Sequence, residues 1–251
     1  MQTIQEVLQA LDEIIEDCIQ RKSPLGIFAF VYRRVTAEVK AGVEKGVFVD
    51  NQRMERLDVV FAKRYIDAYW QYLNGQPVTG SWAAAFRAEP RPLAVLQHLL
   101  LGMNAHIHLD LGIAAAQVAP GEGIYALQSD FEQINVLLLE LVDEMQSRLA
   151  SVSKGILFLD WMGRNRDEWL AGLGIRVGRN FAWKQAQRLA RVEGNKQEKA
   201  IEQLDKHVVH WANLIANPTP TWIWFFWRIL YWLEEKDLDE LLATLREPDA
   251  H

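Results

Sequence analysis

The sequence predicts an all-α fold, a single-domain multi-helix bundle around one central, largely apolar helix. Apolar residues recur at three- and four-residue spacing through most of the 251 residues, as they do along the buried face of a helix. No run of strict two-residue alternation lies between hairpin turns, so strands are not expected. A chain of this length can bury a substantial core, and we expect residues 1–251 to form one helical domain.

Turn-forming and capping residues predict where the helices end. We expect the first helix over about 2–20, ended before Pro24, because a proline disfavours helical geometry at the residue that precedes it. The second helix spans about 24–45 and ends at Gly46, and the third begins after an Asp50 cap and runs to about 73. Further helices are expected over about 93–117, 130–150, 153–171, 175–193 and 195–216, with a Trp-rich helical extension from about 218.

Composition and charge argue against nucleic acid as a partner. The chain has 27 Lys and Arg against 33 Asp and Glu, a formal net charge of −6, so no overall positive field attracts a phosphate backbone. The basic pairs Arg33-Arg34 and Lys63-Arg64 lie among acidic residues, a pattern typical of a solvated helix face. We therefore expect no nucleic-acid partner.

Cysteine content and segment lengths indicate a cytoplasmic protein. Cys18 is the only cysteine, so an internal disulfide and the Cys-rich zinc patterns are excluded. The first twenty residues carry acidic side chains in an amphipathic pattern, which indicates a first helix rather than a secretory signal. The Trp-rich run 222–233 covers about 12 residues against the roughly 20 that cross a bilayer, so no transmembrane segment is expected.

Polar side chains interrupt the apolar helix expected over 93–117. Burying such groups costs several kcal/mol unless they are paired, so each of them needs a partner in the fold. At 100° per residue the polar positions divide into two stripes on opposite sides of the helix. One stripe holds His98, Gly102, His106 and Asp110, and the other holds Asn104 and His108.

Distances along the helix axis separate these candidates further. A rise of 1.5 Å per residue places His106 and Asp110 about 6 Å apart and His98 about 12 Å from His106. His106 and Asp110 can therefore share one ion or one hydrogen bond, whereas His98 needs another partner or contributes to an elongated pocket. Gly102 leaves space for a ligand or for a close neighbouring helix. We assign Gly102 and Asn104 to substrate binding.

Two interpretations of the His106 and Asp110 pair stay open. In the functional one, the pair acts as an acid–base couple or binds a divalent transition metal, completed by groups from another helix. In the structural one, Asp110 only fixes the imidazole ring within the bundle. A His-x-x-x-Asp pair lacks a third ligand, and the sequence has no His-Glu-x-x-His, Walker A or Gly-x-Ser-x-Gly motif.

The third helix offers residues that can face this stripe. Asp58, Phe61 and Tyr65 share one side of it, and Asp58 is a candidate second catalytic carboxylate because a core-facing aspartate requires a partner. The alternative is a salt bridge of Asp58 with Arg56, with Lys63 or with a neighbouring segment of the chain. Phe61 and Tyr65 are assigned to substrate binding.

Asp130 and the Trp-rich tail are two further features of the sequence. Asp130 is expected to cap the helix that it begins, with Gln133 three residues later. The Trp-rich tail has more aromatic surface than one helix usually buries, and core packing, a homodimer contact, a substrate pocket and attachment to a membrane interface all stay open.

Three segments resemble one known family. They are PLAVLQHLLLGMNAHIHLDLGIAAAQVAPG around the polar stripes, RLDVVFAKRY at 56–65 and DFEQIN at 130–135, and together they are similar to the bacterial domain-of-unknown-function family 5995 over roughly 25–190. The resemblance implies a helical fold and names no reaction. The family usually has Asn where this chain has His108, which makes His108 a poorer site candidate than its neighbours.

We therefore expect a small-molecule enzyme with a His/Asp site in a hydrophobic pocket of the bundle, acting on a small hydrophobic substrate. His106, Asp110, His98 and Asp58 are the candidate catalytic residues, and oxygenase, hydrolase, isomerase and cyclase chemistry stay open. The alternative is a non-catalytic ligand-binding or scaffold protein whose polar helix is structural, including a homodimer formed through the Trp-rich helix.

Overall fold

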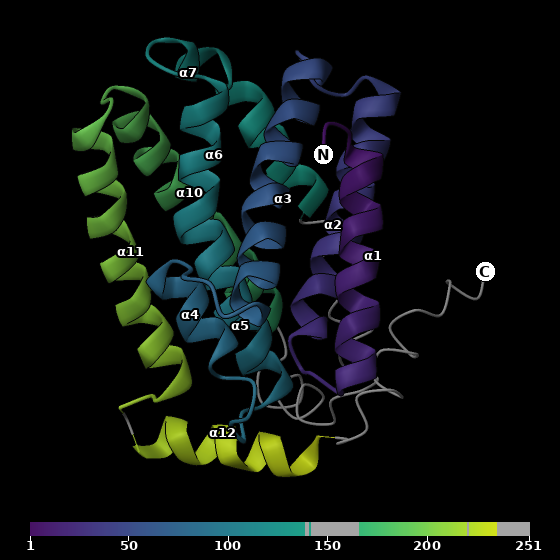
Figure 1. The fold of residues 1–251 in the computed structure, drawn as a ribbon, viewed down its shortest axis with the longest axis vertical. Helices are drawn as coiled ribbons and strands as arrows, with labels where there is room; N and C mark the ends of the chain where they lie inside the picture. Colours follow the sequence, from purple (N-terminus) through teal and green to yellow (C-terminus); the bar gives the residue numbers. More distant parts are fainter. Residues whose placement is uncertain (139–140, 142–165, 220, 235–251) are drawn as a thin grey trace.

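The computed structural model describes residues 1–138, 141, 166–219 and 221–234, without the side chains of 166–174 and 233 (Figure 1). Most of these residues are helical and none of them forms a strand, so the predicted all-α fold is confirmed. On one side of the bundle lie α1 (Ile4–Arg21) and α2 (Gly26–Lys45), which pack against α3 (Asn51–Leu73). On the other side lie α10 (Arg166–Ala190) and α11 (Asn195–Ala216).

One long helix runs through the centre of the bundle and connects the two sides. It consists of α5 (Val95–Ala105), a π-helical turn η1 (His106–Asp110) and α6 (Leu111–Val118). By length and composition this is the one helix of the described residues that could cross a membrane, but most of it is buried inside the bundle. A central, largely apolar helix is therefore what the structure contains, as the sequence predicts.

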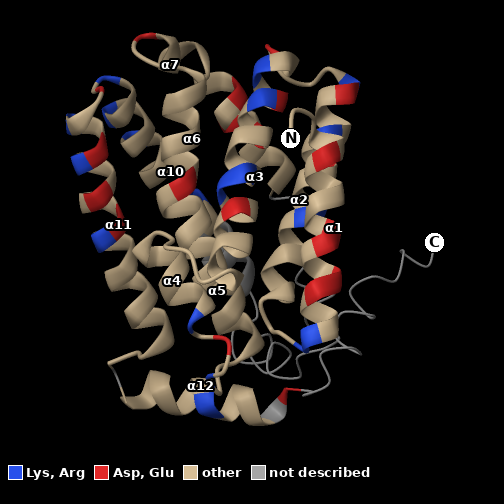
Figure 2. Cartoon of the chain, viewed as in Figure 1, with Lys and Arg blue, Asp and Glu red and all other residues tan. Residues whose placement is uncertain are grey.

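Shorter helices complete the described part of the chain. The helix α4 (Gly80–Phe86) packs beside α5 and α11, and α7 (Gly123–Ala126) follows the central helix. The helix α12 (Thr221–Leu233) lies across one end of the bundle (Figure 1). Acidic and basic residues recur along α1 and α11, whereas α12 has almost none (Figure 2).

Local capping sets several helix ends where the sequence predicts them. The side chain of Asp50 accepts a hydrogen bond from the Arg53 amide at 2.9 Å and begins α3. Gly46 ends α2 in the left-handed region, at φ 72°, where a glycine has no steric penalty. Both ends depend only on residues within one helical turn, and both predictions are confirmed.

Two other helices begin at carboxylates from distant parts of the chain. Asp205 of α11 accepts hydrogen bonds from the Gly80 and Ser81 amides at the start of α4. Glu234 accepts one at 2.7 Å from the Val95 amide at the start of α5. A carboxylate suits these positions because the first amides of a helix lack intrahelical acceptors and carry partial positive charge.

Asp130 is a third carboxylate that accepts hydrogen bonds from distant amides, and here the local-cap prediction is wrong. Asp130 lies inside a helix that begins at 128, and its carboxylate accepts hydrogen bonds from the Val49 and Asp50 amides at 2.6 and 3.2 Å. The Arg53 guanidinium donates a further bond at 2.7 Å. Asp130 therefore ties its own helix to the segment that leads into α3.

The predicted division near 171–175 is also wrong. The helix α10 runs without a break from Arg166 to Ala190, although Gly172 and Gly174 favour a break by propensity. Tertiary packing overrides this preference, because α10 lies along α6 at close range. A Cβ on Gly112 would lie 3.1 Å from the Ala182 carbonyl oxygen, so a side chain there would push α10 away by a few tenths of an ångström. The helices expected over 130–150 and 153–171 lie partly outside the described residues, at 139–140 and 142–165.

Replacing Asp130 with Ala is expected to lower the free energy of unfolding by about 2–4 kcal/mol, since two amides and a largely buried guanidinium lose their acceptor. Urea denaturation of the full chain measures this loss. Glu132→Ala, two residues away on the exposed side, is the matched control and should change stability by less than about 0.5 kcal/mol. Equal losses in both variants would contradict the long-range cap.

Candidate functional site

A buried ion pair joins the central helix to α3 and α4. The Asp110 side chain has no exposed surface. Arg64 of α3 donates from Nε to Oδ1 at 2.7 Å, and Trp82 of α4 donates from Nε1 to Oδ2 at 2.8 Å. Burial raises the pKa of Asp110, but the Arg64 charge and these hydrogen bonds outweigh it, so the pKa lies below its ordinary value. Asp110 is therefore an ionised carboxylate inside the bundle.

His106 lies one turn before Asp110 and is enclosed by aromatic rings. Its ring stacks on Phe61, with centroids 3.6 Å apart, and meets the edge of Tyr32 at 4.3 Å. Phe28 lies at 5.6 Å and Tyr65 at 6.2 Å. Burial lowers the pKa of His106, although the Asp110 charge opposes this effect. The imidazole is therefore neutral near pH 7, which is the form that accepts a proton.

The contact between His106 and Asp110 is long. Nδ1 of His106 and Oδ2 of Asp110 are 3.6 Å apart, beyond the length of a normal hydrogen bond. Neither ring nitrogen of His106 has a hydrogen-bond partner, although both are buried. Asp110 therefore acts on the imidazole mainly through its charge, and the ring nitrogens keep their capacity to bind a further group.

Three more buried polar groups belong to Tyr32 and Tyr65, whose rings contact His106, and to Asp58, which lies near Tyr32. The hydroxyls of Tyr32 and Tyr65 and the Oδ2 atom of Asp58 are buried and have no hydrogen-bond partner. Burial and the Asp58 charge both raise the pKa of Tyr32, so these two side chains lie close together. Burial, with a contribution from Glu55, raises the pKa of Asp58 to about 7. We define the buried acid–base cluster as Tyr32, Asp58, Tyr65, His106 and Asp110.

The π-helical turn places two of these residues. The amide of Leu111 donates to the His106 carbonyl, five residues earlier, so this turn contains one residue more than an α-helical turn. Such turns occur often at functional sites. In this one, His106 and Asp110 face α2, α3 and α4, while the other polar stripe faces α10 and α11.

The second polar stripe, Asn104 and His108, connects the central helix to α10 and α11. The Asn104 amide donates to the Val208 carbonyl of α11 at 3.0 Å, and its oxygen lies 3.1 Å from Nδ1 of His108. The His108 ring packs against Phe181 of α10 and Trp211 of α11. The structure thus directs Asn104, assigned to substrate binding from the sequence, away from the His106 ring.

The structure brings some of the expected residues together and leaves others apart. Phe61 and Tyr65 contact the His106 ring from α3, on the side where we expect them, and Asp58 lies near Tyr32 rather than in a contact with the imidazole. His98 does not join this cluster, and burial, with the nearby Arg91 charge, lowers its pKa to about 4. Asp58 pairs with neither Arg56 nor Lys63 among the hydrogen bonds and ion pairs of the described residues, so the salt-bridge alternative has no support there.

Gly102 accommodates a neighbouring helix. A Cβ at this position would lie 2.5 Å from a ring carbon of Phe28 of α2. Of the two roles expected for Gly102, space for a ligand and space for a neighbouring helix, the structure therefore shows the second. The Phe28 ring fills the space in which we expected a ligand. The surroundings of His106 are filled by the chain's own rings.

The donor set does not suit a divalent metal. Both oxygens of Asp110 already accept hydrogen bonds, and the Arg64 cation lies 2.7 Å from one of them. A second cation there would be repelled and would have to displace this pair. The described residues contain no group of three or more His, Cys, Asp or Glu side chains placed to hold a metal ion. We derive no step through a metal at His106 and Asp110.

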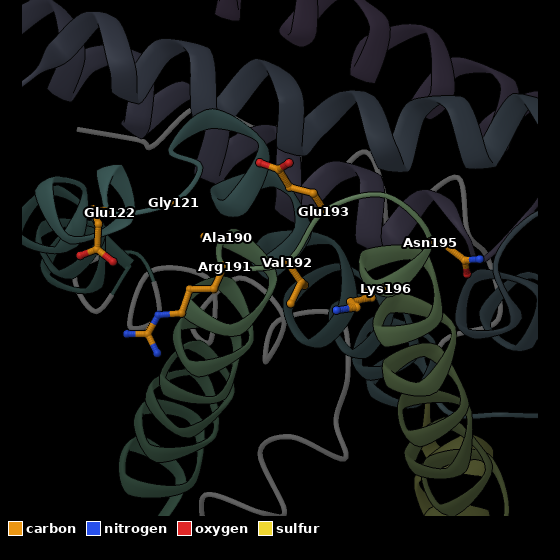
Figure 3. Close-up of a pocket in the computed structure, with 8 residues that line it drawn as sticks. All are labelled: Gly121, Glu122, Ala190, Arg191, Val192, Glu193, Asn195 and Lys196. Atoms are coloured by element: carbon orange, nitrogen blue, oxygen red, sulfur yellow. The ribbon is translucent and has the colours of Figure 1, made fainter.

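An open cavity of about 760 Å³ lies elsewhere, where α10 ends and α11 begins (Figure 3). Its lining is mixed, with both polar and apolar surface, and carries acidic and basic side chains. Its lining residues are Gly121, Glu122, Ala190, Arg191, Val192, Glu193, Asn195 and Lys196. No residue of the buried acid–base cluster lines it.

Sequence reasoning missed Arg64, Trp82, Tyr32 and Phe28. Arg64 looked like part of a solvated basic pair, but its side chain is only 24% exposed and reaches Asp110. The available signal was the aspartate itself, because an ionised carboxylate in an apolar helix requires a cation. Which of the many basic residues supplies it depends on how the helices pack.

Fold and site together define a class, a helical bundle protein with a buried acid–base cluster beside its central helix. Residues 4–218 match the Family of unknown function (DUF5995), and the chain belongs to this family, as its motifs indicate. The match excludes α12 and covers more of the chain than the quoted motifs. No curated protein and no solved structure matches the chain.

Gly102→Ala should destabilise the fold by about 1–3 kcal/mol, because the added methyl group overlaps the Phe28 ring. This loss outweighs the gain of about 1 kcal/mol that alanine brings to a helix. Gly123→Ala is the matched control, since nothing lies within 4 Å of a Cβ there. Thermal and urea denaturation measure both, and a neutral or stabilising Gly102→Ala would contradict the close contact.

Asp58→Asn should stabilise the protein relative to wild type as the pH rises. Below about pH 4 the carboxyl is protonated in both states. Between its ordinary pKa of 3.8 and about 7 the unfolded chain loses the proton while the folded chain retains it, so wild-type stability falls. The relative gain from pH 4 to pH 8 is on the order of 4 kcal/mol.

Urea denaturation of wild type and Asp58→Asn at several pH values measures this gain. His98 also makes stability depend on pH, but it does so in both proteins, so its contribution cancels when their free energies of unfolding are subtracted. Asp67→Asn, at a half-exposed position on the same helix, is the control for replacing a carboxylate of α3 with an amide. A flat difference for Asp58→Asn would mean that its pKa is not raised.

Proposed function

We propose that this protein is an enzyme that transfers protons on a small, largely hydrophobic ketone, with neutral His106 as the base. The observation that carries the proposal is the set of buried polar atoms without partners around one imidazole. They belong to Tyr32, Asp58, Tyr65 and His106. Native proteins leave few buried polar groups unpaired, so a group of them around one ring indicates a bound molecule that pairs with them.

The chemistry of these groups supports acid–base catalysis. His106 accepts a proton from the carbon next to the carbonyl, and the Asp110 carboxylate stabilises the imidazolium that forms. The negative charge then develops on the substrate oxygen, where the neutral hydroxyls of Tyr32 and Tyr65 donate hydrogen bonds. In a β,γ-unsaturated ketone the enolate extends to the γ-carbon, and Asp58, which with a pKa of about 7 is partly protonated near neutrality, donates its proton there. Water then takes the proton from His106 and returns one to Asp58, so both groups regain their starting forms. The sum of these steps is an isomerisation.

Phe61 provides the route to the imidazole. It is half-buried, and its ring covers one face of His106 at a centroid distance of 3.6 Å. Rotation of Phe61 exposes that face without moving a helix, and its ring then forms a wall of the site. Arg64 lies one turn further along α3 and is also half-buried, so the ion pair borders the same opening.

A non-catalytic role is the second candidate, and the closure of the site favours it. His106 is only 2% exposed, and both oxygens of Asp110 have strong partners. In this interpretation the cluster fixes the register of α2, α3 and the central helix. His106→Ala and Asp110→Ala would then lose stability to a similar extent and change no ligand-induced shift in melting temperature.

The catalytic proposal is tested by deuterium exchange next to the carbonyl of small cyclic and aromatic ketones in D₂O, followed by NMR. The wild type should exchange at least one ketone faster than buffer alone. His106→Gln and Tyr32→Phe should each slow this exchange by about 100-fold or more, which is typical of a lost acid–base group. Phe61→Leu should keep the exchange and change the preferred ketone.

The matched control is His108→Asn, on the opposite stripe, which replaces a histidine with the residue expected from the family resemblance. It should leave the exchange within about twofold of wild type, because residues outside the reacting groups contribute little to the rate. Exchange that is absent in wild type for every ketone, or unchanged in His106→Gln, would overturn the proposal.

A further inference from the structure

The helix α12 is fixed to the bundle by contacts at both of its ends. Glu234, directly after it, accepts a hydrogen bond from the Val95 amide at the start of the central helix. Arg91 donates to Asn217, just before it, at 2.6 Å. Within the helix, Leu230 is 1% exposed and packs inward. The orientation of α12 across the end of the bundle is therefore set by the fold (Figure 1).

The outward face of α12 is aromatic and exposed. Trp222 is 73% exposed, Phe225 61% and Ile229 42%, and at 100° per residue these three fall within an arc of about 60°. No other described helix has more than one exposed large hydrophobic side chain. Such a row is unusual on a surface that only contacts water, and it indicates an interaction site.

We propose that this face of α12 binds the interface of a lipid bilayer, with the helix lying in the membrane plane. Tryptophan prefers the headgroup level, and an in-plane helix buries one apolar face at this depth. Thirteen residues are too few to span the hydrocarbon core. The only ionisable side chain with charge on α12 near pH 7 is Arg228, whose guanidinium lies 5.8 Å from the Trp224 ring centroid. An arginine can lay the aliphatic part of its side chain along apolar surface while its guanidinium reaches the polar lipid headgroups.

A second copy of the chain fits this face less well than a bilayer does. Large apolar side chains have about 150–250 Å² of accessible surface each, so Trp222, Phe225 and Ile229 at their exposed fractions offer a partner about 400 Å². Stable interfaces bury about 800 Å² on each partner. A bilayer has no such minimum, because each aromatic side chain that enters it contributes independently.

Charge specifies the kind of lipid surface. The chain has a formal net charge of −6, which gives it no attraction to anionic lipids, and α12 supplies a single positive charge. Binding through this face is therefore driven by apolar burial and does not need negative lipids. It should persist at high ionic strength, because salt screens charge interactions and leaves apolar burial intact.

Sedimentation with vesicles of zwitterionic phosphatidylcholine tests this inference on the full chain. Wild type should sediment with the vesicles equally at about 0.1 M and about 0.5 M NaCl. Trp222→Ser/Phe225→Ser should bind at least about tenfold more weakly, since two aromatic groups no longer enter the interface. Val49→Ser/Val177→Ser removes exposed apolar groups elsewhere, at 81% and 56% exposure, and should bind like wild type.

Three results would overturn the inference. They are wild type that stays in the supernatant, equal binding by the Trp222→Ser/Phe225→Ser variant, and binding that disappears at high salt. Light scattering tests whether the face is instead a contact between two copies of the chain. If the wild type is a dimer that does not bind vesicles, and Trp222→Ser/Phe225→Ser is a monomer, the face is such a contact. Circular dichroism checks that both double variants keep the helical fold. The inference does not rest on the proposed enzymatic function.

Discussion

The carboxylate of Asp110 and the guanidinium of Arg64 meet inside the bundle, and the arrangement around them follows from the need to keep that charge paired. Asp110 has no exposed surface, so an ionised group there is tolerated only with a cation and hydrogen-bond donors in place. Arg64 comes from α3 and Trp82 from α4, which fixes both helices against one turn of the central helix. That turn carries His106, and the position of the imidazole among the rings is thus tied to the same contact.

The same physical demand recurs at the helix N-termini. Asp205 and Glu234 accept hydrogen bonds from the first amides of a helix, and Asp130 accepts them from the segment just before one. In each case the amides lie 80 to 139 residues earlier in the chain than the carboxylate. A helix start exposes amides that need acceptors, and here the acceptors come from the later part of the sequence. These bonds join the early helices to the late ones, in addition to the apolar core.

The buried acid–base cluster is costly for stability, and the proposed chemistry depends on the same loss of water. Asp58 and His106 have lost water without gaining full hydrogen-bond partners, which raises the pKa of the first and lowers the pKa of the second. Shifts in these directions bring both groups toward neutral forms near pH 7, as acid–base catalysis requires.

Helical periodicity, the Asp50 cap and the Gly46 stop were all determined by the sequence, because each depends on residues within about one turn of the helix. The two opposite polar stripes of the central helix follow from the same local geometry. Only the tertiary structure decided that Arg64 is the cation of Asp110, that Asp130 serves α3 and that α10 continues past its glycines. It also decided that rings fill the space around His106 and Gly102. Those outcomes depend on which distant segments pack together, and residue spacing along one helix carries no information about that choice.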